Sequence, residues 1–572
     1  MAEKLMSPGV FTQENDLSYL PRGIGEIGAA VVGPTVKGPV MVPIKVESYA
    51  DYINTFGETV ESGSNTYQYL TSHAAKEYLK HGSPLTVVRV ATGTYAPASA
   101  SVTASLAATD SFTLYTIGDG SIYNNSGSTS TNDLLVEGTK DNFRWEVSNV
   151  NDSKGTFTLT VRRGDDRENR KIALETWTNL TLDPNEPNYI ARVIGDQKPT
   201  YVANGTDPYI EMSGSYANKS KYIRVADVTN TLNYLDDNGD VRLAEASASL
   251  PAAGSGSLYG AFSGGSNGTV NSPINFYENI STDSQGITVS TCTEYTNAIN
   301  LLGNQDEYDI NLLMTPGITK TDHSTLVNAA IEMCETRGDC FYIMDLANWN
   351  SSITTTTGLQ DLNTSYAATY WPWVQIVDSS TNAYRWVPAS VVMGGVIAFN
   401  DKVAYEWYAP AGLNRGGVES AVRAERKLTH SNRDTLYDVS INPLASFPNE
   451  GIVCWGQKTL QKKASALDRV NVRRLLIKAK KYIASLSRYL VFEQNTAQTR
   501  DRFLNIANPF FEGIQQNQGL YAFKVVMDDT NNTPDVIDRN ILKGEIYLQP
   551  ARTAEYIVVD FNVTSTGAEF GA

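Results

Sequence analysis

The stretch INLLM at residues 310–314, followed by FYIMD at residues 341–345, decides the fold of this chain. Both are short apolar runs that predict buried strands, and the residues at 324–336 predict a helix between them. Because a strand, a helix and a second strand follow one another at this distance, we expect parallel pairing with a right-handed crossover. The region therefore predicts an α/β unit.

A similar α/β unit lies nearer the N-terminus. Residues 27–32 and 85–90 are apolar runs that predict two further strands. Residues 66–81 between them predict a helix, because apolar side chains recur on one helical face: Tyr67, Leu70, Ala74 and Tyr78. We predict that residues 23–95 and 281–420 form one discontinuous α/β middle domain.

The segment between these two units has a different composition. Residues 96–280 are rich in Ser, Thr, Asn and Gly, and they hold short alternating stretches at 143–147, 156–161 and 189–193. Alternation of apolar and polar residues is typical of half-buried strands. We predict one or two inserted β-rich domains that face outward.

The last predicted domain, residues 421–572, contains a long basic helix and a terminal strand. Ser465 and Asp468 have the spacing of a capping box, so the helix is predicted over 465–492. The apolar face of this helix consists of Val472, Leu476, Ala479, Ile483, Leu486 and Leu490. The terminal strand is predicted over 552–566, with four apolar residues on one side: Ile557, Val559, Phe561 and Val563.

The first 22 residues predict an extended arm. The sequence Ser-Pro-Gly at 7–9 and the proline at 21 do not suit a regular helix. The short run between them predicts a strand of three residues, Val10, Phe11 and Thr12. Such a strand is too short to be stable alone, and a frayed terminus is the alternative interpretation. Taken together, the chain predicts a multidomain α/β or α+β protein with extended strands at both ends.

Charge and hydropathy exclude several classes of protein. The 572 residues include 62 acidic and 46 basic side chains, and the net charge of −16 disfavours nucleic acid as a partner. The longest apolar stretch, 389–399, is shorter than the roughly twenty residues of a membrane span, so we predict no membrane insertion. Residues 1–20 lack the apolar core of a secretory signal. Four cysteines in 572 residues do not make a disulfide framework. We expect synthesis in a reducing cytoplasm.

Motifs that carry enzyme chemistry fit this sequence poorly. The four histidines are not spaced with cysteines or carboxylates as metal ligands would be. The letters GGSNG at 264–268 match a nucleophile elbow, but they lie in a Gly/Ser/Asn loop and not between a strand and a helix. The acidic run at 236–240 lacks the closing glutamate of a calcium loop and predicts a turn. We therefore predict no catalytic residues, no cofactor, no metal site and no enzymatic activity.

Basic residues gather in one segment. Residues 458–488 contain ten basic side chains and one acidic side chain, a net charge of +9 in an acidic chain. Helical spacing predicts a basic stripe beside the apolar one, made by Arg474, Lys478, Lys481 and Arg488. Three interpretations stay open for this stripe: a solvated helix face, a membrane or nucleic-acid surface, and a surface for an acidic protein partner.

The order of several motifs makes the sequence resemble the tail sheath proteins of contractile phage tails. The motifs are SPGV at 7–10, GAAVVG at 28–33, YINTFG at 52–57, YAATYWPW at 366–373, VPAS at 387–390, the segment 394–401, APAG at 409–412 and NRGG at 414–417. The pair Asn442-Pro443 and the long basic helix also fit. The likeness covers about residues 5–95 and 280–572.

The resemblance implies a structural machine. Sheath proteins of this family form hexameric rings that stack helically around a tail tube in a high-energy extended state. A baseplate signal triggers contraction, which drives the tube through the host envelope. The expected partners are further copies of the chain, the tail tube protein, and the baseplate and tail terminator proteins. The expected location is the virion tail, assembled in the bacterial cytoplasm.

The resemblance also gives the chain ends and the basic stripe a role. In this family the N-terminal arm and the C-terminal strand add to a small sheet in a neighbouring subunit, a mode known as β-augmentation. A basic stripe against an acidic tube would set registry and still permit release, because exposed charges are screened by salt. We therefore predict that Arg474, Lys478, Lys481 and Arg488 face the tube.

Two alternatives accompany this prediction. The same sheath could belong to an R-type bacteriocin or another contractile injection particle instead of an infectious virion. From a different class, the Ser/Thr/Asn-rich region with its tyrosines would suit a polysaccharide-binding protein or a glycosidase. A glycosidase needs two carboxylates at a fixed separation, which a sequence does not display.

Overall fold

A computed structural model describes residues 28–559, apart from 63–64, 106–108, 130–133, 206, 237, 243–248 and 271–273. An eight-stranded sheet lies at its centre, in the order β2-β5-β1-β17-β18-β19-β23-β24. Its strands are β1 (Gly28–Gly33), β2 (Ile44–Val46), β5 (Leu85–Arg89), β17 (Ile310–Thr319), β18 (Phe341–Asp345), β19 (Ala367–Trp371), β23 (Asn442–Phe447) and β24 (Gly451–Cys454).

The middle of this sheet is parallel, from β5 through β1, β17, β18 and β19 to β23. Only the two outermost strands, β2 and β24, pair antiparallel with their neighbours. Strand β1 lies directly beside β17, so segments from opposite ends of the inserted region pair in one sheet. The strands predicted at 27–32, 85–90, 310–314 and 341–345 are all present in it.

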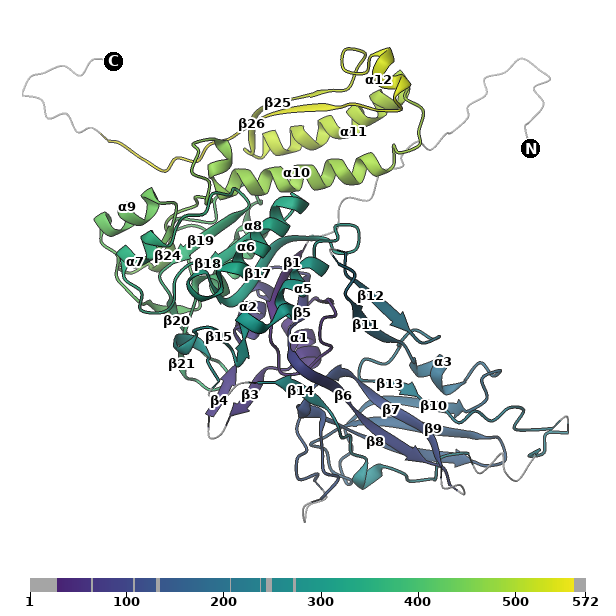
Figure 1. The fold of residues 1–572 in the computed structure, drawn as a ribbon. Coiled ribbons are helices and arrows are strands. Elements are labelled where there is room, and N and C mark those ends of the chain that lie inside the picture. The colour runs from purple at the N-terminus through teal and green to yellow at the C-terminus, as the bar shows by residue number, and fades with distance from the viewer. Residues whose placement is uncertain are drawn as a thin grey trace, which may run out of the picture.

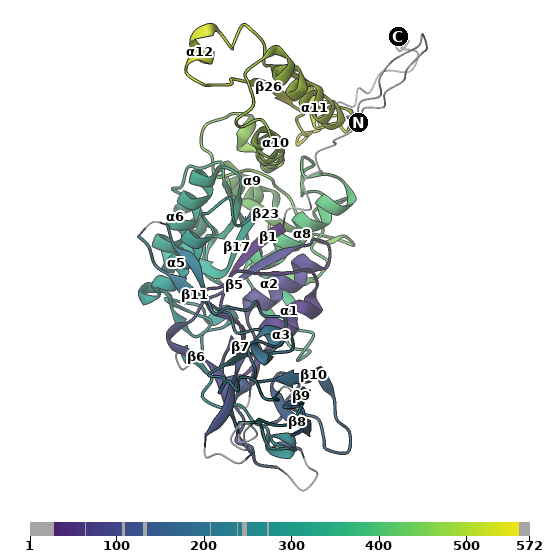
Figure 2. The same ribbon diagram turned by 90° about the vertical axis from the view of Figure 1, so that its right-hand side faces the viewer.

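Helices cover both faces of the sheet (Figures 1 and 2). Side chains alternate between the faces, because Ala29 and Val31 join one hydrophobic cluster and Ala30 and Val32 join another. The first cluster lies under α1 (Tyr49–Phe56), α2 (Leu70–Leu79) and α8 (Ala389–Val403), and the second under α5 (Thr293–Leu301) and α6 (Lys320–Arg337).

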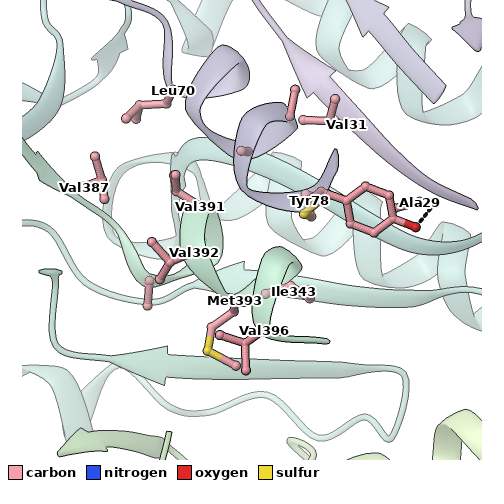
Figure 3. Close-up of a cluster of buried hydrophobic side chains, with 14 of the residues drawn as sticks. Ala29, Val31, Leu70, Tyr78, Ile343, Val387, Val391, Val392, Met393 and Val396 are labelled. Carbon is pink, nitrogen blue, oxygen red and sulfur yellow. Dashed lines mark hydrogen bonds between the residues drawn. The ribbon is translucent and has the colours of Figure 1, made fainter. Parts of the chain in front are cut away.

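Helices α2 and α8 pack closely on the first face, as Figure 3 shows with Tyr78, Val391, Val392 and Val396. The Ala29 N–H donates a hydrogen bond to the Tyr78 hydroxyl at 3.2 Å, which ties α2 to β1. The apolar stretch 389–399 is therefore a buried helix of the core. No helix of the described residues has the length and hydropathy to cross a membrane.

The inserted segment is rich in strands and lies at the end of the central sheet away from the C-terminal helices (Figures 1 and 2). It has its own hydrophobic cluster, in which Phe112 stacks on Phe157 at 5.7 Å between ring centroids. Its strands are β6 (Thr92–Thr103), β7 (Asp110–Asp119), β8 (Phe143–Asn151), β9 (Thr156–Arg163), β10 (Ala173–Thr181), β11 (Lys198–Val202), β12 (Tyr209–Ser213), β13 (Ile223–Ala226) and β14 (Ser266–Thr269).

The strand predicted at 189–193 is wrong, because this stretch forms the single-turn helix α3 (Ile190–Ile194). Its buried residues Ile190 and Ile194 are four apart, which is a helical spacing. The helix predicted over 66–81 is shorter than expected. Residues 65–68 instead form β4 (Asn65–Gln68), paired with β3 (Thr59–Ser62), so α2 begins at Leu70.

The C-terminal part forms a separate layer of helices with a two-stranded sheet above the central sheet (Figure 1). Its elements are α10 (Val470–Arg488), α11 (Ala497–Gln516), β25 (Leu520–Val526), α12 (Pro534–Asp538) and β26 (Glu545–Pro550). Strands β23 and β24 lie within the predicted C-terminal domain 421–572 but belong to the central sheet. The layer above that sheet therefore begins after β24, and not at residue 421.

The basic helix is shorter than predicted at both ends. The Ser465 side chain caps a 3₁₀ turn at Ala466–Asp468, and Arg469 is extended, so α10 begins only at Val470. It ends at Arg488 instead of 492. The remaining small elements are β15 (Asp283–Ser284), β16 (Ile287–Thr288), α7 (Ile353–Gly358), β20 (Val374–Val377), β21 (Tyr384–Val387), β22 (Ala421–Ala424) and α9 (His430–Asp438).

Candidate assembly interfaces

The antiparallel hairpin β25–β26 has two free edges in the described chain. Its strands pair with each other from Val526 opposite Glu545 to Leu520 opposite Pro550, and no third strand of the described residues joins them. One side of the hairpin packs on α11, where the rings of Phe511 and Phe523 lie 5.6 Å apart. An open strand edge presents unpaired N–H and C=O groups, so this hairpin can accept an added strand.

The chain leaves this hairpin as an extended segment (Figure 1). Residues 551–559 form no ladder with another described strand, and Ile557 and Val559 are 83% and 63% exposed. They belong to the predicted terminal strand 552–566, whose other two named residues, Phe561 and Val563, lie outside the described residues. The predicted N-terminal strand of Val10, Phe11 and Thr12 also lies outside them. The linking role of both ends stays a prediction.

The predicted basic stripe of α10 points toward the central domain. The buried Arg474 guanidinium donates to both carboxylate oxygens of Asp401 at 2.7 and 2.5 Å. Lys478 Nζ lies 2.7 and 2.6 Å from the carboxylate oxygens of Glu406. Burial alone would lower the pKa of Arg474, but Asp401 and Glu406 raise it overall. The stripe therefore joins α10 to the end of α8 and the loop after it.

Lys481 and Arg488 complete this set of contacts. Lys481 Nζ, which is buried, lies 2.5 Å from Asp309 Oδ1 and 3.4 Å from Asp339 Oδ2. Arg488 contacts Asp306 at 2.8 Å, and both of these side chains are exposed. The segment before β17 and the turn before β18 thus supply acidic partners for the second half of α10.

Three residues of the predicted tube-facing stripe, Arg474, Lys478 and Lys481, form ion pairs within the chain, and the tube-facing role of the stripe stays a prediction. Their positive charges are matched by carboxylates of the same chain. Arg488 is the one member of the stripe that the structure leaves exposed. No sequence signal identified the partners, because the acidic residues come from segments far from α10 and from one another.

The apolar face of α10 packs against α11. Leu475 and Ala479 join one buried cluster with Phe511, and Tyr482 stacks on Phe510 at 3.8 Å between ring centroids. Leu486 joins a second cluster with Phe503. Helices α10 and α11 and the hairpin therefore share a continuous apolar core.

The residues considered for catalysis or metal binding have structural roles. Ser266 lies in β14, where its hydroxyl donates to the Thr94 carbonyl at 2.9 Å, and this is not the strained turn of a nucleophile elbow. His73 is buried in α2, and burial lowers its pKa. Asp236 accepts backbone N–H groups from Asn238 and Asp240, as expected for a turn. The described residues contain no cluster of side chains suited to a metal ion.

Two parts of the chain match domains of a known family. Residues 288–460 match the phage tail sheath protein central domain, and residues 462–564 match the phage tail sheath C-terminal domain. The tail sheath protein of Vibrio phage KVP40 is 37% identical over 233 residues, which is 40% of this chain and 35% of the relative. The tail sheath protein of Enterobacteria phage T4 is 37% identical over 227 residues, 40% and 34% respectively. The alignments thus span about a third of the length of these curated relatives.

The fold has a counterpart along nearly its whole length. The crystal structure of the sheath tail protein Lin1278 from Listeria innocua aligns with a TM-score of 0.56 over 93% of each chain, at 9% identity. The central sheet, its helices and the helical C-terminal layer therefore define a mixed α/β fold that this Listeria protein shares. The matches to the two phage tail sheath domains confirm the resemblance that the sequence motifs between residues 366 and 443 carry.

Proposed function

We propose that the chain is the structural subunit of a contractile tail sheath. It polymerises as stacked hexameric rings around a tail tube in an extended, metastable state. Contraction then drives the tube through the host cell envelope for genome delivery. The observation that carries this proposal is the succession of both sheath domains along residues 288–564. The subunit resides in the virion tail, is assembled in the host cytoplasm, and meets the baseplate and tail terminator proteins at the two ends of the sheath.

The two chain ends link neighbouring subunits. The open edges of the hairpin β25–β26 are the acceptors, and the strands at residues 10–12 and 552–566 of neighbouring copies are the donors. One backbone hydrogen bond contributes only about 0.5–1.5 kcal/mol net. A ladder at every junction of a polymer is much stronger through multivalency. The subunits can then rotate as rigid bodies during contraction while their links persist.

The inserted β-rich segment forms the outer face of the sheath. Its position at the end away from the hairpin supports this assignment, because the linking elements must lie within the wall of the polymer. The protein has no catalytic role in this proposal. The tube-facing role of the α10 stripe is centred on Arg488, because its side chain stays exposed although it pairs with Asp306. Salt screens an exposed charge of this kind within about 8 Å.

Electron microscopy of the purified protein in negative stain tests the proposal. The expected result is long hollow cylinders built from subunit rings, formed alone or around co-expressed tube protein. Small closed oligomers or monomers under all assembly conditions would contradict the sheath function.

A further inference from the structure

One carboxylate holds the C-terminal segment where it leaves the hairpin. Glu555 lies five residues after β26 and accepts two hydrogen bonds from Arg469, Nε to Oε1 at 2.6 Å and Nη2 to Oε2 at 2.9 Å. The Tyr437 hydroxyl donates to Oε2 at 3.0 Å, and Gln457 Nε2 donates to Oε1 at 3.2 Å. Four hydrogen bonds from three separate segments thus converge on this one side chain.

The donors belong to the body of the subunit. Tyr437 lies at the end of α9, Gln457 follows the edge strand β24, and Arg469 immediately precedes α10. Gln457 Nε2 also donates to Thr553 Oγ1 at 2.6 Å, two residues before Glu555. The segment is therefore fixed to the central sheet and to the start of α10, and not only to the hairpin from which it comes.

The chain changes character directly after this carboxylate. The next four residues, Tyr556, Ile557, Val558 and Val559, are between 63% and 84% exposed. A run of exposed apolar side chains in extended backbone suits pairing with another chain, whereas Glu555 is mostly enclosed, with 18% of its side chain exposed. The anchored and the exposed parts of the segment thus meet between residues 555 and 556.

We propose that Glu555 is a positioning residue, which fixes the point and direction at which residues 556–559 leave the subunit toward a second copy of this chain. The proposal rests on the linking role given above to the terminal strand. Without the anchor, the segment would be held only at Pro550, where β26 ends. Glu555 lies five residues further along, and five extended residues span about 17 Å. Releasing the anchor therefore lowers the effective concentration of the strand at its acceptor, although no contact with the neighbour is lost.

The anchor can be measured in the full-length soluble subunit before it assembles. All four native cysteines are buried, so spin labels on Ser446→Cys in β23 and Val559→Cys report the distance between the body and the segment. We expect a narrow distance distribution in the parent protein and a broad one in Glu555→Gln. A hydrogen bond to a charged group corresponds to roughly a tenfold change in an equilibrium, so the released population rises about tenfold or more.

Matched variants separate positioning from general stability. Asp535→Asn also removes a carboxylate, but one in α12 that pairs with Arg539, where both side chains are exposed, so its distribution should stay narrow. Arg469→Gln should broaden the distribution as Glu555→Gln does, and the double variant should broaden it no further, because both changes remove the same interaction. A narrow distribution in Glu555→Gln would overturn the proposal.

Polymer formation gives the second readout, by sedimentation and microscopy of the same variants without labels. We expect Glu555→Gln to lower the polymer yield several-fold and Asp535→Asn to leave it unchanged. A broad distance distribution with normal polymer yield would overturn the positioning role and leave the sheath function intact. Normal polymers from a chain that ends at residue 555 would instead overturn the linking role of the strand itself.

Discussion

The Arg474 guanidinium on α10 and the Asp401 carboxylate on α8 form a two-point ion pair, although 73 positions separate them in the sequence. Arg474 is 4% exposed, so the pair lies at the boundary between the C-terminal layer and the central domain. The pair therefore fixes α10 of that layer to α8 of the central domain. The basic character of α10 thus joins two layers of one subunit.

Removing one partner of this pair should destabilise the protein. In Asp401→Asn the buried guanidinium loses its counter-charge, which typically costs about 3–5 kcal/mol. Arg488→Gln removes an exposed pair on the same helix and should cost less than about 1 kcal/mol. Urea unfolding followed by fluorescence compares the two. Equal midpoints for both variants would contradict the role given to Arg474 and Asp401.

Two glycines should respond to alanine in opposite directions. A Cβ at Gly395 in α8 would lie 2.8 Å from the Glu77 carbonyl oxygen of α2, so Gly395→Ala should separate the packed helices and cost about 1–3 kcal/mol. A Cβ at Gly513 in α11 meets nothing within 4 Å, so Gly513→Ala should stabilise by up to about 1 kcal/mol through helix propensity. Thermal unfolding measures whether each variant is stabilised or destabilised. A stabilised Gly395→Ala would show that α2 and α8 are not in close contact.

A buried carboxylate predicts how stability depends on pH. Asp345, at the end of β18, accepts hydrogen bonds from the Ser390 N–H at 3.0 Å and from its hydroxyl. Burial raises its pKa to about 7, although the Ser390 bonds act in the other direction. Because this value exceeds the ordinary 3.8, the stabilising contribution is fully present below pH 3.8 and is lost as the pH rises through 7.

Asp345→Asn should remove that dependence. The amide oxygen can still accept from Ser390, but it does not titrate. Between pH 5 and 8 the parent should lose about 2.5 kcal/mol more unfolding free energy than the variant. Chemical denaturation at several pH values measures the difference. Parallel pH profiles for the two proteins would mean that Asp345 is already ionised throughout this range.

Deleting the N-terminal arm should separate folding from assembly. A chain that begins at residue 23 retains every strand of the central sheet, so its melting temperature should stay close to that of the parent. We expect it to form monomers or single rings and no long polymer. Sedimentation and microscopy check this outcome, and long regular cylinders from the shortened chain would contradict a linking role for the arm.

Four strands of the central sheet, β1, β5, β17 and β18, were predictable from the sequence, because parallel strands buried on both faces need continuous apolar runs. The apolar runs at 310–314 and 341–345 are each bounded by turn residues, and they therefore indicate such buried strands. The ends of α10 were not predictable. The Ser465 side chain caps a local 3₁₀ turn, and the spacing from Ser465 to Asp468 is the same as at the start of an α-helix. The stretch 189–193 is too short for the period of its apolar residues to distinguish a strand from one helical turn.

The role of the basic residues was also hidden from the sequence. Ten basic residues in one segment indicate a charged face, but they do not tell whether its partner lies in the same chain. The partners are carboxylates of the same chain, and only the fold brings them to α10: Asp306, Asp309, Asp401 and Glu406. The anchor at Glu555 is hidden for the same reason, because Tyr437, Gln457 and Arg469 become neighbours only in three dimensions.

Intermolecular cross-linking tests most directly whether strand exchange joins the subunits. One population of chains carries Val559→Cys, and a second carries Tyr521→Cys on β25 or Tyr547→Cys on β26, both of which are exposed positions. Because each chain has one accessible cysteine, a cross-linked dimer reports contact between two copies. We predict efficient cross-linking of the mixed polymer to one of the two hairpin strands, and none in dilute soluble subunits. Regular polymers that cross-link to neither strand would contradict the account.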